Sequence, residues 1–321
     1  MQKIVTSIML AASLVSCAGK GAQSETASAA DAAAATPKVV FNADSAFNNV
    51  KRQVDFGPRV GNTEPHRRTA EWLADELRRH GAEVSLQKMK LNSCDGVTLD
   101  AVNTIGQYNP QATDRLLLLA HWDTRPWADS DADEANHKTP VDGANDGASG
   151  VGVLLEVARL LAQNKTDKGI DILFVDAEDR GNHDDKESWA LGAKYFVDNP
   201  FREGYIPSQA ILLDMVGGRG AKFYYEGFSM QGAPSLLAQI WQYAKEAGYG
   251  DRFIQAPGGA VTDDHVRFLD AGIPAIDIIE FDPNSPNGFN ATWHTTGDNM
   301  SNIDPATLKA VGQTLTNFIF E

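Results

Sequence analysis

The stretch RLLLLAHWDT, residues 115–124, places five apolar residues in a row directly before His121, Trp122 and Asp123. A continuous apolar run of this length is typical of a strand that is covered on both faces, as in a parallel sheet. The same reading predicts further strands at 83–91, 97–107, 170–176, 209–214 and 274–279.

Helical patterns lie between most of these strands. In EPHRRTAEWLADELRRHG, Pro65 suits the first turn, Trp72 and Leu77 share an apolar face, and Gly81 ends the helix, so we expect Trp72 in the core. Strands that alternate with helices predict an α/β protein with one domain of three layers (α/β/α) around a mixed, mostly parallel sheet. The other expected helices are 42–54, 147–164, 187–198, 233–247, 264–271 and one from about 305 onward.

The composition excludes some functions. The 321 residues are 42% apolar and 22% charged, which is ordinary for a globular protein. A formal net charge of −15 argues against nucleic acid as a partner, because neutralisation of phosphates needs basic patches. No apolar run after the N-terminus is long enough to cross a bilayer.

The first 17 residues, MQKIVTSIMLAASLVSC, have the order of an export signal: a basic start at Lys3, an apolar core and small residues before a cleavage site. The end of this stretch, LVSC, resembles the bacterial lipobox. That resemblance implies a signal peptide at 1–16, cleavage before Cys17 and acylation of its thiol. A plain signal peptide cut nearby is the alternative. We therefore expect an exported lipoprotein, anchored in a membrane and facing the periplasm or the cell surface.

Residues 17–40 are small, polar and rich in Ala, which predicts a flexible tether before a folded domain at 41–321. Cys94 is the only other cysteine, so the sequence offers no intrachain disulfide framework, and we assign Cys94 no chemistry. We expect a monomer.

Acids and histidines follow the predicted strands. Ligands bind beyond the carboxyl ends of the strands in α/β sheets, so these residues are site candidates. A buried cluster of carboxylates repels itself and loses solvation, and a metal ion is the simplest positive partner. Oxygen and imidazole ligands without thiolates suit zinc better than manganese or magnesium. The candidates are His121, Asp123, Asp146, Glu178, Asp179, Asp214, Asp277, Glu280 and His294.

Taken singly, three of these candidates also have purely structural interpretations. Asp146 could only cap the helix that follows it, because a short acidic side chain accepts free backbone N–H groups. Asp214 could cap a turn, and His294 could be a surface residue.

Five blocks of sequence, in order, resemble the zinc-dependent aminopeptidases of the M28 type: AHWD, GANDGASGVGVLLEVARLL, LFVDAEDRG, LLDMVG and WHT. Within that superfamily, TDDHVRFLDAGIPAIDII followed by WHTTGDNMSNID is similar to the glutaminyl-peptide cyclotransferases, or glutaminyl cyclases. The similarity runs from FGPRVGNTEPH to the C-terminus. It implies an M28 aminopeptidase-like fold and conversion of the N-terminal Gln of peptides or proteins into pyroglutamate, with release of ammonia.

The resemblance also implies roles for single residues. Asp146, Asp179 and His294 match the ligands of one catalytic Zn²⁺, and Glu178 matches the carboxylate that transfers the proton. Animal enzymes carry Glu-Glu where this chain has Glu178-Asp179, and they carry a histidine in place of Asp277. These departures affect substrate range and rate more than the reaction.

Other matches surround that centre. Asp264 corresponds to an acid that orients or relays the proton, and Asp214 to the residue that holds the substrate's α-amine. Trp293 matches an aromatic that lines the pocket. Trp189 and Trp122 could wall it too, or could belong to the core.

Two rival functions remain open. In a two-zinc aminopeptidase, His121 and Asp214 would hold a second ion, Asp146 would bridge the two, and water would hydrolyse the terminal residue. In a third interpretation, the chain is a surface lipoprotein with a retired enzyme fold that only binds peptides. We expect the acidic segment 125–142 to be a solvated loop that shapes access to the pocket, because the Gly and the spacing of an EF-hand are missing.

Overall fold

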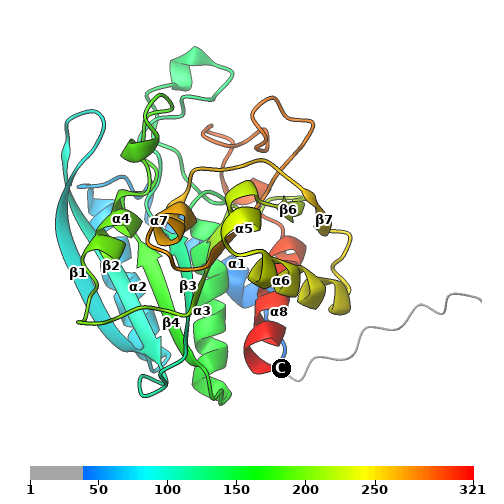
Figure 1. Ribbon diagram of the computed structural model, residues 1–321. Coiled ribbons are helices and arrows are strands. Elements are labelled where there is room, and N and C mark those ends of the chain that lie inside the picture. The colour runs from blue at the N-terminus through cyan, green and yellow to red at the C-terminus, as the bar shows by residue number, and fades with distance from the viewer. Residues whose placement is uncertain (1–38) are drawn as a thin grey trace, which may run out of the picture. The chain divides into compact units, whose positions relative to one another are not determined.

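The central sheet dominates the computed structural model, which describes residues 39–321 (Figure 1). Its six strands lie in the order β1-β2-β4-β3-β5-β8. The last four in this order are parallel, whereas β1 pairs antiparallel with β2 and β2 antiparallel with β4. The predicted mixed, mostly parallel sheet is confirmed. The strands are β1 (Glu83–Asn92), β2 (Thr98–Tyr108), β3 (Arg115–His121), β4 (Gly169–Val175), β5 (Gln209–Asp214) and β8 (Ala275–Ile279).

Helices cover both faces of this sheet (Figure 1). In β3, Leu118 and Ala120 belong to one hydrophobic cluster, whereas Leu117 and Leu119 belong to another, because side chains alternate along a strand. The three predicted layers are confirmed. The first cluster includes α1 (Ala43–Val54), α2 (Glu64–Arg79), α3 (Ala148–Gln163), α6 (Pro234–Glu246) and α8 (Pro305–Phe320), and the second includes α4 (Leu191–Asp198) and α7 (Asp264–Asp270).

Helix α3 lies unusually close to β5. A Cβ atom on Gly150 would be 2.2 Å from the carbonyl oxygen of Leu213, so only glycine fits there. This approach brings the start of α3, where Asp146 stands, next to the end of β5, where Asp214 stands.

The structure differs from the sequence predictions in three places. The helix predicted from 187 begins at Leu191, because Ala190 has a φ of 56° that a helix does not contain. Trp72 is half-buried at the edge of the core, where it packs against Phe56. A second, two-stranded parallel sheet and a short helix were not predicted, because three to six residues carry too little periodicity. These elements are β6 (Phe223–Tyr225), β7 (Phe253–Pro257) and α5 (Gly227–Gly232).

The predicted signal peptide at 1–16, the lipidated Cys17 and most of the tether lie outside the described residues. Within 39–321, no helix combines the length and the apolar character needed to cross a bilayer.

Candidate active site

The three predicted zinc ligands converge beyond the carboxyl ends of the parallel strands. Asp146 precedes α3, Asp179 follows β4, and His294 lies between β8 and α8. Nε2 of His294 is 3.0 Å from Oδ1 of Asp179 and 3.5 Å from Oδ2 of Asp146. All three residues are buried, and their ligand atoms lie within 4.8 Å of one another. The three side chains are therefore close enough to bind one metal ion together.

A second group shares Asp146. Nε2 of His121 is 3.0 Å from Oδ1 of Asp146 and 3.1 Å from Oδ1 of Asp214. Asp146 thus presents one oxygen to each of the two histidines. Burial opposes its charge, but hydrogen bonds from His121 and His294 hold the pKa of Asp146 below its usual range. The residues of the rival two-metal site are therefore also together.

At the remaining carboxylates the cost of burial outweighs the stabilisation that His121, His294 and Arg125 provide. Burial raises the pKa of Glu178 well above its usual value, and Asp263 and Asp179 add repulsion. Burial, with the charge of Asp146, raises the pKa of Asp214 to about 7. Burial likewise raises the pKa of Asp179, although Nε2 of His294 lies 3.0 Å from its Oδ1.

This donor set fits a zinc ion. Two carboxylates and one imidazole are ligands that zinc accepts, and three protein ligands leave a coordination position open, as in catalytic zinc sites. A cation beside Asp179 would also offset the repulsion between the charges of Asp179 and Asp146.

Two further carboxylates fix the loops that carry the ligands. Asp123 accepts the backbone N–H groups of Glu178 at 3.1 Å and of Asp179 at 3.2 Å. Asp298 accepts the N–H groups of Asn145 at 2.8 Å and of Asp146 at 3.0 Å. These contacts hold the backbone at Asp179 and Asp146 without using the carboxylates of these two predicted ligands.

Three non-glycine residues at the site have left-handed backbone conformations. Ala177, directly before Glu178, has a φ of 57°, and Met215, directly after Asp214, has a φ of 46°. His294 itself has a φ of 53°. Such conformations cost about 1–3 kcal/mol and are retained where the surroundings enforce them, often at functional sites.

A cavity of about 270 Å³ opens beside the triad. Asp146, Glu178, Asp214 and His294 form part of its lining. Its apolar wall is aromatic: the ring of Trp293 stacks on His294 at 3.7 Å and on Phe289 at 4.5 Å. An apolar pocket with a few convergent polar groups suits a small organic ligand. Its other lining residues include His183, Lys186, Trp189, Asp263, Ile279 and Phe281.

Two predicted site residues need correction. Trp122 is fully buried, stacks on His66 at 4.4 Å and does not line the cavity, so it belongs to the core. Asp264 is buried and does not line the cavity either, whereas its neighbour Asp263 does. Asp263 is the N-cap of α7 and remains in the loop, while Asp264 is already in the first turn. The acid relay therefore fits Asp263 better than Asp264.

Several site residues were missed from the sequence. Asp298 lies in TTGDN, inside a block that carries the family resemblance, so it could have been found there. Phe281, Phe289 and His183 line the cavity from loops that have no periodic pattern. Trp189 and Trp293 do line it, as expected.

Comparison with known proteins places these features in a family. The model of peptidase family M28 matches residues 103–319. The glutaminyl-peptide cyclotransferase of Drosophila melanogaster is 25% identical over 289 residues, which cover 82% of this chain and 77% of that protein.

Solved structures are closer in sequence. The crystal structure of Bacteroides thetaiotaomicron glutaminyl cyclase bound to N-acetylhistamine is 51% identical and aligns over 88% of this chain and 99% of that one, with a TM-score of 0.85. A Zn-dependent exopeptidase from Parabacteroides distasonis is 48% identical over the same shares, with a TM-score of 0.87. The resemblance to M28 enzymes and glutaminyl cyclases is confirmed.

Proposed function

The chain belongs to peptidase family M28, and on this premise we propose that it is a glutaminyl-peptide cyclotransferase that uses one zinc ion. Its substrates would be peptides or proteins with N-terminal Gln. The observation that carries the proposal is a small aromatic cavity beside the triad of Asp146, Asp179 and His294, with the acid Glu178 in its lining. Likeness to solved glutaminyl cyclases over most of the chain supports it.

The residues suit the steps of cyclisation. When bound, zinc would supply Lewis acidity that polarises the side-chain amide carbonyl of the substrate. Glu178, whose pKa burial raises, is suited to take a proton from the α-amine and to give it to the amide nitrogen that leaves as ammonia. Because the nucleophile belongs to the substrate, the protein must mainly hold it folded. We assign that task to Asp214, facing the α-amine, and to Trp293 and Trp189 in the cavity wall.

Mass spectrometry of a peptide with N-terminal Gln tests the proposal. With purified protein we expect a loss of 17 Da, the mass of ammonia, and a blocked N-terminus. A chelator should stop the reaction, and added zinc should restore it. An unmodified peptide after incubation with zinc-loaded protein would refute the proposal.

The second candidate function is a two-metal aminopeptidase. The observation that favours it is the group of His121, Asp146 and Asp214, whose ligand atoms lie within 4.8 Å of one another. The same assay separates the two functions, because a peptidase releases a free amino acid and leaves a new amine.

We also propose that the protein is an exported, monomeric lipoprotein attached to a membrane through Cys17. The support is the order of residues 1–17 and the tether-like composition that follows. Metabolic labelling with a fatty acid should mark the wild-type protein and not the Cys17→Ser variant, and light scattering of the delipidated protein should give the mass of one chain.

A further inference from the structure

The acidic loop 125–142 contacts His294 through the side chain of Asp129 and the backbone of Ser130. We propose that Asp129 in this loop is the outer carboxylate that orients the imidazole of His294, and that the loop fixes the backbone of His294 as well. The inference deepens the proposed function and rests on it, because it takes His294 as a metal ligand. Asp129 is a positioning residue in this role and does not touch the substrate.

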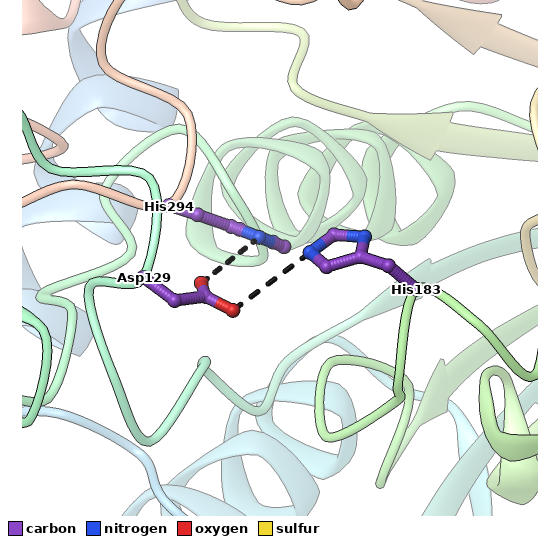
Figure 2. Close-up of side chains that lie close together, drawn as sticks. All are labelled: Asp129, His183 and His294. Carbon is purple, nitrogen blue, oxygen red and sulfur yellow. Dashed lines mark ion pairs between the residues drawn. The ribbon is translucent and has the colours of Figure 1, made fainter.

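The first observation is the place of the Asp129 carboxylate (Figure 2). Its Oδ1 is 3.7 Å from Nδ1 of His294, on the side of the ring away from the nitrogen that faces Asp179 and Asp146. Nδ1 is buried and has no hydrogen-bond partner among the described residues. A metal-bound histidine usually donates its other N–H to a carboxylate, a carbonyl or water, which fixes the tautomer and the ring orientation. Asp129 is the carboxylate placed for this contact.

The second observation is that Asp129 is itself clamped. Nε and Nη2 of Arg125 donate to its two oxygens at 2.7 and 2.6 Å. The guanidinium is buried, and its Nη1 also donates to the backbone oxygen of Asp179 at 3.3 Å. A bidentate pair restricts both side chains. Arg125 therefore links the carboxylate of Asp129 to the backbone of Asp179, a second predicted ligand.

The third observation concerns the backbone. The N–H of Ser130 donates to the carbonyl oxygen of His294 at 3.1 Å. Two residues later, Thr296 donates from its N–H at 3.0 Å and from its Oγ1 at 2.6 Å to Oδ2 of Asp131. These bonds restrain the segment in which His294 has its left-handed φ. The loop thus contacts both the imidazole ring and the backbone of His294. This role goes beyond shaping access to the pocket.

Zinc affinity tests this directly, without an activity assay. We expect Asp129→Asn to weaken the binding of one equivalent of zinc about 10–100-fold in competition with a chromophoric chelator. The matched control is Asp133→Asn, which makes the same charge change in the same loop. The Asp133 carboxylate accepts the N–H of Ala135 and forms no hydrogen bond or ion pair with His294 among the described residues. We expect the control to stay within about twofold of wild type, and Asp129→Glu, which keeps a carboxylate, to recover part of the loss.

A competing explanation is that Asp129, His183 and His294 themselves form a metal site, since their ligand atoms lie within 4.8 Å of one another (Figure 2). In that case His183→Ala would lower zinc affinity or stoichiometry as much as Asp129→Asn. We expect His183→Ala to retain the affinity, because in our proposal His183 only flanks Asp129. Equal losses in these two variants would overturn the proposal, and so would equal affinities of Asp129→Asn and Asp133→Asn.

Two further measurements keep the test decisive. Thermal unfolding of each metal-free variant shows whether a loss of affinity is only a loss of the fold. If Asp129→Asn does not fold, Thr296→Val tests the backbone restraint with Asp129 in place, and unchanged zinc affinity in that variant would contradict the role of the loop.

A protein that binds zinc as expected but forms no pyroglutamate would refute only the proposed function. An active cyclase with unchanged affinity in Asp129→Asn would refute only this inference.

Discussion

Buried carboxylates lie at both ends of strands β3 and β4, but their charge and hydrogen-bond partners differ between the two ends. At the amino ends, Asp171 is fully buried and has a complete set of partners. Arg115 donates to its two oxygens at 2.7 and 2.6 Å, Gln107 donates at 3.1 Å, and the hydroxyl of Tyr205 donates at 2.8 Å. The remaining Arg115 nitrogen donates to backbone carbonyl oxygens.

At the carboxyl ends, 3 and 4 residues beyond β4, stand Glu178 and Asp179. Burial raises the pKa of both. The nearest fixed cation, Arg125, has its Nη1 3.8 Å from Oδ1 of Asp179 and is already paired with Asp129. The difference teaches that burial alone does not mark a functional acid. A buried acid whose neighbours do not fully compensate its charge is a candidate for binding a cation or a substrate when it also lines a cavity, as Glu178 does.

The largest effect that this comparison predicts is a loss of turnover when Glu178, at the carboxyl ends of the strands, is replaced. Glu178→Gln should lower the rate of pyroglutamate formation about 10²–10⁴-fold, because general acid–base catalysis contributes about that much. Zinc content should stay the same, since Glu178 does not belong to the ligand triad. Rates measured alongside metal analysis check this, and an unchanged rate would remove Glu178 from the reaction.

The largest effect on stability should come from breaking the pair of Arg115 and Asp171 at the amino ends of the strands. Arg115→Met leaves Asp171 buried without its charge partner, which should destabilise the fold by about 3–5 kcal/mol in urea unfolding. Activity per folded molecule should not change, because this cluster lies at the opposite end of the strands. Adding Asp171→Leu should restore much of the stability. A loss of activity without a loss of stability would show that the two ends are not independent.

Metal removal should affect only the carboxyl ends. A ligand that binds only the folded state at a free concentration 100-fold above its Kd stabilises that state by about 2.7 kcal/mol. Thermal unfolding in such an excess of free zinc and after chelation should therefore differ by several degrees, and Asp179→Ala should abolish the difference. Arg115→Met should keep it. Identical midpoints for the zinc-loaded and metal-free wild-type protein would contradict the metal site.

The contrast between the ends was only partly visible in the sequence. Apolar runs located the central strands and the acids at their ends, because such runs are local, and the family resemblance predicted the triad of Asp146, Asp179 and His294. The partners of those acids are not local. Asp298 accepts the N–H of Asn145 from 153 residues away, and Arg115 meets Asp171 from 56 residues away. Nothing in a strand's own pattern states which acid will be neutralised.

Neighbouring residues were also hard to separate. Asp263 and Asp264 differ in sequence by one position, but one caps a helix and lines the cavity while the other lies in the first turn. Trp122 directly follows β3, a position where pocket residues are expected, but its ring stacks on His66 in the core. Side-chain direction at the end of a strand depends on backbone geometry that the residue types do not reveal.

The smallest predicted effect is a pH dependence confined to the metal-free protein. The pKa of Asp214 is about 7 in the folded state, raised by burial and by Asp146, against 3.8 for the free side chain. The folded state therefore holds a proton that the unfolded state has lost, and this contribution to stability disappears as the pH rises toward 7. The pKa of His121 is also raised, so its contribution has the same sign.

Between pH 6 and pH 7 the titration of Asp214 alone should thus remove about 1 kcal/mol from the free energy of unfolding of the metal-free wild-type protein. Asp214→Asn should show a flatter dependence, because it removes one titrating group and the hydrogen-bond partner of His121. Urea unfolding at both pH values provides the measurement. Equal slopes for the two proteins would mean that Asp214 is already neutralised within the fold, as Asp171 is, and that the carboxyl ends of the strands need no cation at this position.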